Sequence, residues 1–406
     1  MTDKQPHTSN SKPSNTTTSP SHSFADLHDA EIFAAHEGGK IETHSRRPLE
    51  TVRDLSIAYT PGVARVCEAI HEEPERAREY TWAGRNVAII SDGTAVLGLG
   101  DIGAKAALPV MEGKAQLFGR FAGLNAIPIV LDTTDVDDLV HTIEAMAPSF
   151  GAINLEDISA PRCFEIERRL IESLDIPVMH DDQHGTAIVI TAALRNACQL
   201  LNRRLKDLKV VISGAGAAGV ACAKMLIHAG VRDVIMLDSR GIIHPDRTPL
   251  TQIKQEMAAI TNPRRITGGV AEALRGADTF IGLSRGHVGE AALQSMAADP
   301  ILFSLANPDP EIDPDLAYKY GAIVATGRSD LPNQINNVLA FPGIFHGALA
   351  AGAKQITPAM KLAASRAIAN VAAEALDVEH IVPSPLDGRV APAVSAAVRA
   401  AALASK

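Results

Sequence analysis

The sequence predicts an α/β protein with parallel sheets, and three observations support this. Short apolar runs alternate with amphipathic runs, and the connections between them are short. The chain of 406 residues is long enough for two domains, at roughly 150 residues each. Hydrophobic residues make up 46% of the sequence but aromatic residues only 4%, so Ala, Val, Leu and Ile must fill the cores.

The first half contains four expected strands. Residues 1–23 have no large apolar residue after Met1, and we expect a disordered tail there. Helical patterns follow over Phe24–Ala35 and Arg53–Glu68. The strands are expected at Asn86–Ser91, Ile127–Asp132, Ala152–Asp157 and Ile176–Asp182, with helices through the Lys114 region, over 136–148 and over 163–174.

The second half repeats the alternation of strands and helices. An apolar helix is expected over Gly185–Leu201, and a new strand series opens at Lys209. A later helix is expected to begin at Thr357-Pro358, where a capping hydroxyl precedes a proline in the first turn. The sequence therefore predicts a first domain over 24–179 and a second over 180–406, which ends in Ala-rich helices.

Charge and cysteine content argue against several classes of protein. The net charge of −9, without a basic run, argues against nucleic acid or an anionic membrane as partner. The four cysteines are scattered, which argues against a disulfide framework and fits a reducing compartment. No apolar run reaches the roughly 18 residues that a membrane span needs, and the N-terminus lacks a secretory core. We expect a cytoplasmic protein.

A glycine-rich loop in the second half predicts a dinucleotide site. The run KVVISGAGAAG places a strand directly before Gly214, Gly216 and Gly219, and a helix follows. The first glycine allows a tight turn, the second a close approach to a pyrophosphate, and the third packing of helix on strand. Backbone N–H groups at the helix start suit phosphates. We therefore expect a Rossmann-like domain that binds the cofactor through Gly214, Ala215, Gly216, Ala217, Ala218 and Gly219.

The strand VIMLD ends at Asp238, nineteen residues after Gly219. An acidic residue at this place accepts hydrogen bonds from ribose hydroxyls, which favours NAD. Arg240 follows closely and Arg247 is near, and an arginine can instead take the 2′-phosphate of NADP. Both cofactors remain possible.

Two pairs of carboxylates follow two expected strands of the first half. Glu156-Asp157 end one strand and Asp181-Asp182 end another. In a parallel sheet both pairs lie at the carboxyl edge, where open α/β sheets bind ligands. Four carboxylates repel one another unless a cation lies between them, and oxygen ligands suit Mg²⁺ or Mn²⁺. The alternatives are a Zn²⁺ site that uses the flanking His180 and His184, or acids that only cap helices.

The stretch Val96–Lys114 contains four glycines before a helical run, and the lysine that closes it is a candidate base. A lysine acts as a base if burial or a nearby cation lowers its pKa. Tyr59, in a Tyr-Thr-Pro-Gly turn, can donate a proton to a carbanion. The alternatives are a solvated lysine and a tyrosine with a packing role.

These motifs together resemble the malic enzyme family in its shorter bacterial form. The matching stretches run in family order over about Leu55 to Phe345 and several are long and distinctive. They are AYTPGVA (58–64), SDGTAVLGLGDIG (91–103), PVMEGK (109–114), NLEDI (154–158), DDQHGTA (181–187), GAGAAG (214–219), ANPDPEI (306–312) and NQINNVLAFPGIF (333–345).

The resemblance implies oxidation of malate with NAD(P)⁺ and decarboxylation to pyruvate and CO₂, with Mg²⁺ or Mn²⁺. By motif, Lys114 corresponds to the general base and Tyr59 to the general acid. It also implies a homodimer or larger homo-oligomer and makes the first domain catalytic. The remaining correspondences are Glu156, Asp157 and Asp182 as metal ligands, Asn307 as a substrate or cofactor contact, and Asn337 as a substrate contact.

One position departs from the larger members of the family, which carry an arginine for the substrate carboxylate where this chain has Ala95. Arg53, Arg85, Asn336 and Asn337 are candidates for that partner. Two rival functions share these motifs: a malolactic enzyme that retains its NAD, and a nucleotide-binding regulator without catalysis. Lys114, Tyr59 and the carboxylates argue against the regulator.

Overall fold

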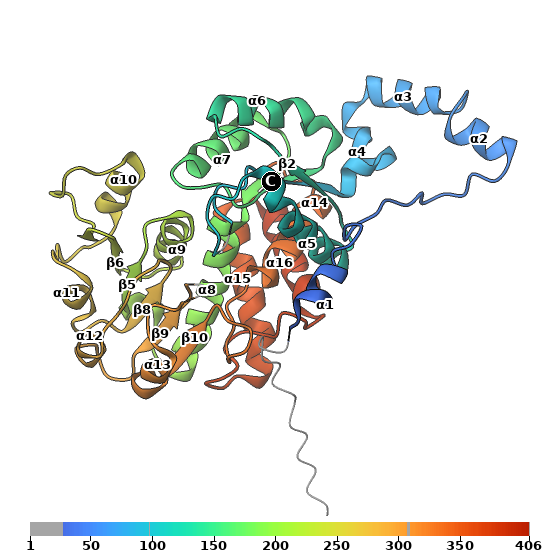
Figure 1. The fold of residues 1–406 in the computed structure, drawn as a ribbon. Coiled ribbons are helices and arrows are strands. Elements are labelled where there is room, and N and C mark those ends of the chain that lie inside the picture. Colours follow the sequence, from blue (N-terminus) through green and yellow to red (C-terminus); the bar gives the residue numbers. More distant parts are fainter. Residues whose placement is uncertain (1–26, 97, 307–308, 406) are drawn as a thin grey trace, which may run out of the picture.

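The computed structural model describes residues 27–96, 98–306 and 309–405. Within them the chain forms two separate sheets, each covered by helices on both faces, so the predicted α/β fold is confirmed (Figure 1). The tail predicted over 1–23 lies outside the described residues. Among the helices of the described part, none combines the length and the apolar character needed to cross a bilayer.

The first sheet has four parallel strands in the order β2-β1-β3-β4. One face packs against α6 (Val136–Met146) and α7 (Arg162–Ser173), and the other against α5 (Ala104–Ala122) and α14 (Phe341–Ala350). Side chains alternate along a strand, so Ala88 and Ile90 contact one layer while Val87 and Ile89 contact the other. The strands are β1 (Asn86–Ser91), which matches its prediction, β2 (Asn125–Val130), β3 (Ala152–Leu155) and β4 (Val178–His180).

The second sheet has the order β10-β9-β8-β5-β6-β7, and only β7 is antiparallel. The chain moves from β5 to β6 on one side and to β8 on the other, so the sheet has a switch point at the carboxyl end of β5, where ligands bind. Its elements are β5 (Lys209–Ser213), α9 (Ala217–His228), β6 (Asp233–Asp238), β7 (Gly241–Ile242), α10 (Gln252–Ile260), α11 (Val270–Leu274), β8 (Thr279–Gly282), α12 (Glu290–Gln294), β9 (Ile301–Ser304), α13 (Pro314–Tyr320) and β10 (Ile323–Thr326).

Helix α8 (Asp181–Leu200) starts earlier than predicted. The expected strand over Ile176–Asp182 ends at His180, and Asp181 is already helical. The 20 residues of α8 span about 30 Å, and the helix packs against α9 and α15 (Pro358–Ala372). Helix α15 begins where predicted, with the Thr357 hydroxyl as its cap. The last helix, α16 (Val390–Ala404), packs against α14 and α15.

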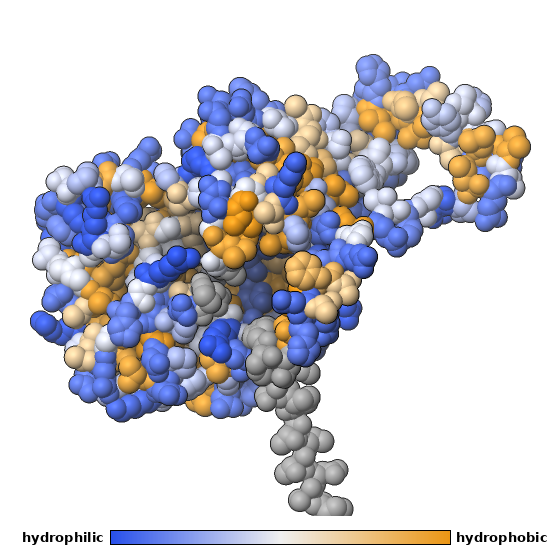
Figure 2. All heavy atoms as spheres, in the orientation of Figure 1, coloured by the Kyte–Doolittle hydropathy of each residue, from blue (hydrophilic) through white to orange (hydrophobic). Residues whose placement is uncertain are grey.

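The N-terminal helices contain no buried residue. Helices α2 and α3 form an arm that projects away from both sheets (Figure 1). Apolar side chains on this arm are exposed, among them Val52 at 82% and Ile57 at 61%, and they appear as orange patches in Figure 2. The arm therefore presents apolar surface that this chain does not cover. The N-terminal helices are α1 (Asp29–Ala34), α2 (Val52–Ala58), α3 (Val63–Glu72) and α4 (Ala77–Tyr80), of which α2 and α3 form the arm.

Candidate active site

Lys114 lies in the middle of α5, beneath the carboxyl edge of the first sheet, and its side chain is buried. Its Nζ is 2.5 Å from an oxygen of Asp181 and 2.8 Å from Glu156 Oε1. The ammonium also lies 4.1 Å from the ring centre of Phe341, on α14. The solvated lysine that the sequence left open is thus ruled out. Asp181, which had no separate role in the sequence prediction, is the nearest partner of the lysine.

The structure brings three predicted metal ligands together. Glu156 and Asp157 follow β3, Asp182 lies in the first turn of α8 after β4, and β3 pairs with β4. Ligand oxygens of the three carboxylates all lie within 4.8 Å of one another. Asp182 accepts a hydrogen bond from the backbone N–H of Asp157 at 2.8 Å, and Asn154 donates to Glu156 at 2.9 Å.

The charges of this carboxylate group are only partly compensated, because among the described residues Lys114 pairs with Glu156 alone of the three. Burial and the neighbouring carboxylates raise the pKa of Asp157 to about 9, and burial raises that of Asp182 to about 6 despite Lys114. One buried oxygen of Asp157 has no hydrogen-bond partner among the described residues. Oxygen donors, like charges and an unpaired buried oxygen fit a hard divalent cation such as Mg²⁺ or Mn²⁺. Of the two imidazoles in the Zn²⁺ alternative, His184 is held by Glu167 at 3.0 Å, while His180 Nε2 lies 3.4 Å from an oxygen of Asp182.

The pKa of Lys114 moves against the sequence expectation. Burial favours the neutral amine, but the charges of Asp181 and Glu156 outweigh it and raise the pKa above its ordinary value. The raised pKa depends on the direction of the Asp181 side chain. Both Asp181 and Asp182 are in the first turn of α8, so their side chains point about 100° apart around the helix axis. Asp181 therefore contacts Lys114, while Asp182 lies with Glu156 and Asp157 in the group of candidate metal ligands.

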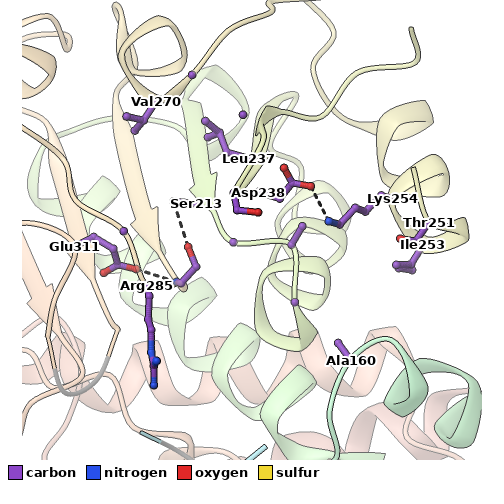
Figure 3. A pocket seen from close by; sticks show the side chains of 18 of the residues that line it. Ala160, Ser213, Leu237, Asp238, Thr251, Ile253, Lys254, Val270, Arg285 and Glu311 are labelled. Carbon is purple, nitrogen blue, oxygen red and sulfur yellow. Dashed lines mark hydrogen bonds and ion pairs between the residues drawn. The ribbon is translucent and has the colours of Figure 1, made fainter. Parts of the chain in front are cut away.

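The predicted dinucleotide loop borders a cavity of about 710 Å³ at the carboxyl end of β5 (Figure 3). Gly214, Ala215 and Gly216 line it, and α9 begins at Ala217-Ala218. A Cβ on Gly219 would lie 1.9 Å from the Gly214 carbonyl oxygen, so only glycine allows this packing of helix on turn. A Cβ on Gly216 would meet nothing within 4 Å, which leaves its backbone open to a pyrophosphate.

Asp238 lines the same cavity at the end of β6, and its carboxylate is already paired. It accepts hydrogen bonds from Arg247, from Lys254 at 2.6 Å (Figure 3) and from the backbone N–H of Arg240 at 2.8 Å. Burial opposes ionisation, but these bonds hold the pKa of Asp238 at about 2. The ionised Asp238 suits the ribose hydroxyls of NAD, whereas Arg247 and Lys254, which contact it, suit the 2′-phosphate of NADP.

Comparisons with known proteins match both halves of the chain. The pattern of the malic enzyme N-terminal domain matches residues 38–171, and that of the malic enzyme NAD binding domain matches residues 183–403. The chain belongs to the malic enzyme family. The predicted family is therefore confirmed.

Relatives of the malic enzyme family cover most of this chain. An NAD-dependent malic enzyme of Geobacillus stearothermophilus is 56% identical, with 91% of this chain and 78% of the relative covered. A bifunctional malic/malolactic enzyme of Bacillus subtilis is 52% identical, with 90% of each covered. The crystal structure of an NAD-dependent malic enzyme from Thermotoga maritima superposes with a TM-score of 0.88 at 46% identity, over 92% of this chain and 99% of that one.

Not all of the predicted malic enzyme site is brought together within one chain. Tyr59 ends α2 on the projecting arm, 67% exposed, away from α5 (Figure 1). Asn337 does lie near the lysine group: a Cβ on Gly185 would touch both Asp181 and the Asn337 side chain, at 2.0 and 3.0 Å. Asn307 lies outside the described residues.

The candidates for the malate carboxylate can now be separated. Arg85 directly precedes β1, so it lies at the amino edge of the sheet, about 20 Å from the carboxyl edge for a six-residue strand. Arg53 is on the arm with Tyr59. The amides remain: Asn336 already accepts the backbone N–H of Val338, and Asn337 is nearest to the lysine group.

Two further residues line the cofactor cavity and were not predicted. Glu311 is buried and accepts the backbone N–H groups of Ser284 and Ala306, which ties the ends of β8 and β9 together. Arg285 reaches from the end of β8 to the Gly98 carbonyl, at 3.4 Å, in the glycine-rich stretch before α5. Glu311 lies in the ANPDPEI motif, so the sequence contained a signal for it, whereas Arg285 had none.

Proposed function

We propose that this chain catalyses the oxidative decarboxylation of (S)-malate to pyruvate and CO₂ with reduction of NAD⁺ or NADP⁺. The observation that carries the proposal is the buried Lys114 in contact with two carboxylates, next to a metal-type group of three. The dinucleotide cavity and the family support it.

Lys114 is the base in this proposal. It takes the hydroxyl proton of malate while the hydride leaves C2 for the nicotinamide, which gives a β-keto acid. The lysine must first be neutral, and Asp181, 2.5 Å away, is the group placed to receive its proton; burial raises the pKa of Asp181 to about 7, which narrows the difference from the amine without removing it. Glu156, Asp157 and Asp182 would hold Mg²⁺ or Mn²⁺, which when bound supplies Lewis-acid stabilisation of the charge left as CO₂ departs.

We further propose that Tyr59 protonates C3 of the resulting enolate in the site of a second copy of the chain. Its own Lys114 is out of reach, and the arm exposes apolar side chains that a partner surface would cover. This assigns the homodimer a catalytic role.

Complementation tests this arrangement. Tyr59→Phe and Lys114→Met are each inactive in the proposal, but a hybrid dimer contains one site with both residues intact. Mixing the two variants under exchange conditions should therefore restore activity. If Tyr59 acts within its own chain, mixing restores nothing, and if it has no catalytic role, Tyr59→Phe alone is already active.

The reaction itself is tested by initial rates with L-malate and Mn²⁺, with NAD⁺ or NADP⁺, and with or without a chelator. We expect NAD(P)H and pyruvate in equal amounts and no reaction with the chelator. Activity that does not depend on a divalent metal would remove the role given to the carboxylate group.

A second candidate is malolactic activity, favoured by the bifunctional relative from Bacillus subtilis. In that reaction the reduced cofactor returns its hydride before release. Product analysis separates the two, because malolactic turnover gives lactate with no net NAD(P)H.

A further inference from the structure

Helix α7 contains an acid on its apolar face. Its buried positions are Cys163, Ile166, Glu167 and Leu170, which follow the i, i+3, i+4, i+7 spacing of a helix face that packs on a core. The Glu167 carboxylate is only 9% exposed. A buried carboxylate is unfavourable unless its hydrogen bonds are satisfied, so its partners indicate what it does.

The partners of Glu167 all lie at the junction between β4 and α8. Its Oε1 accepts the backbone N–H of His180 at 2.8 Å, and its Oε2 accepts the side-chain amide of Gln183 at 3.1 Å. The Nε2 of His184 is 3.0 Å from the carboxylate. These contacts fall on both sides of Asp181 and Asp182, and they account for the side chain of His184, one of the two histidines that the sequence analysis had left open as zinc ligands.

The N-cap of α8 lacks the side-chain hydrogen bond that usually holds the start of a helix. His180 is its N-cap residue, and its side chain makes no capping hydrogen bond. Helix starts usually gain such a bond from Ser, Thr, Asp or Asn. Glu167 instead holds the first turn from a neighbouring helix. Although burial opposes its ionisation, His184 and Lys361 keep the pKa of Glu167 at about 2, so it is an anion at neutral pH.

We infer that Glu167 is a positioning residue for the metal-binding group: by holding the first turn of α8 it fixes Asp182 against Asp157 and Asp181 against Lys114. This rests on the proposed function for the role of those carboxylates. Because both aspartates lie in the same helical turn, a shift of that turn would displace both at once. Residues that orient metal ligands typically change metal affinity or activity by roughly 10–100-fold.

The test is direct Mn²⁺ binding to the full-length protein without substrate or cofactor, measured from the electron paramagnetic resonance signal of free Mn²⁺. Glu167→Gln keeps an oxygen that accepts the His180 N–H. It replaces the other oxygen with an NH₂ group, which cannot accept from the Gln183 amide or the His184 ring. We expect its Mn²⁺ affinity to fall roughly 10–100-fold, with a raised KM for Mn²⁺ and a smaller change in kcat at saturating metal. The matched control is Glu165→Gln, an exposed acid on the same helix, which should bind Mn²⁺ as the wild type does.

The outcomes separate this inference from the proposed function. If the wild type binds no Mn²⁺, the metal site itself is wrong. If the wild type binds and a folded Glu167→Gln binds equally well, only the positioning role is wrong. Should Glu167→Gln fail to fold, Gln183→Ala and His184→Ala each remove one contact: weaker Mn²⁺ binding in both supports the inference, and wild-type binding in both overturns it.

Discussion

The two sheets carry an aspartate at equivalent places with opposite electrostatic surroundings. Asp157 follows β3 at the carboxyl edge of the first sheet, and Asp238 ends β6 at the carboxyl edge of the second. Burial, together with the neighbouring carboxylates, raises the pKa of Asp157 to about 9, whereas Arg247 and Lys254 hold that of Asp238 at about 2 against burial. In the first site the cation Lys114 pairs with Glu156 and not with Asp157, whereas in the second site Asp238 itself pairs with two cations.

This difference separates two ways of building an ionic site. The Asp238 group is complete without ligand, so its ion pairs can stabilise the fold before the cofactor binds. The carboxylate group gathers like charges that favour folding only after a cation arrives, because a ligand that binds the native state alone stabilises it. The carboxyl edge of a parallel sheet thus carries a preformed site around Asp238 and a ligand-dependent site around Asp157.

The largest expected effect comes from Lys114, the one cation in direct contact with the carboxylates of the first site among the described residues. Lys114→Met removes the proposed base, and positioned acid–base groups contribute about 10²–10⁴-fold. We expect kcat with L-malate to fall by that factor. Lys105→Met, on the exposed side of the same helix, serves as control and should retain activity. Unchanged kcat in Lys114→Met would remove the base assignment.

Asp157→Asn should lower activity by about 10²–10³-fold, since a metal ligand is lost and Lewis-acid stabilisation is worth several kcal/mol. The measurement is kcat/KM at several Mn²⁺ concentrations. Asp137→Asn, an exposed carboxylate on α6, is the matched control. Wild-type Mn²⁺ dependence in Asp157→Asn would show that this carboxylate is not a ligand.

The same substitution should stabilise the protein when a chelator is present. Removing one of the mutually repelling, buried carboxylates lowers the free energy of the folded state, and each kcal/mol raises Tm by about 1–2 °C in a chain of 406 residues. We expect Tm to rise by at least that amount in chelator and the order to reverse with excess Mn²⁺. A lower Tm for Asp157→Asn under both conditions would contradict the comparison.

The smallest effect concerns Asp238 and acid. Its pKa is lowered in the folded state, so its contribution to stability is present above about pH 4, the ordinary value, and is lost as pH falls toward 2. Asp238→Asn should lower Tm by a few degrees near neutral pH. This gap, the difference in Tm between the variant and the wild type, should shrink below pH 4. Asp246→Asn, exposed nearby, should show no such gap. A gap that persists unchanged into acid would mean that packing, and not charge, is lost.

Local patterns predicted much of the fold and part of the site. The strand at Asn86–Ser91 and the glycine loop were found because a strand period and a turn are encoded by neighbouring residues. The meeting of Glu156, Asp157 and Asp182 followed from the rule for parallel sheets. The direction of Asp181 could not be predicted, because the helix starts at Asp181, four residues before the predicted start at Gly185, and the direction of a side chain depends on whether its residue is in a strand or a helix.

Long-range placement was the other limit. Nothing near Tyr59 in the sequence indicates that its arm leaves the body of the chain. Glu167, in contrast, had a readable signal: an acid within the apolar stripe Cys163, Ile166 and Leu170. Such an acid costs stability unless it has partners elsewhere, so it points to a buried polar contact even when the partner is unknown.

The early start of α8 divides the charged groups of the first site between the two halves of the coding sequence. Lys114 and Asp157 are encoded before the junction at residue 180, while Asp181 and Asp182 come after it, in the first turn of a helix that packs mainly against the cofactor-binding half. Either half, recombined alone into another protein, would carry an incomplete set of charged groups. A recombination event at this junction should therefore preserve the first site only when both halves are transferred together.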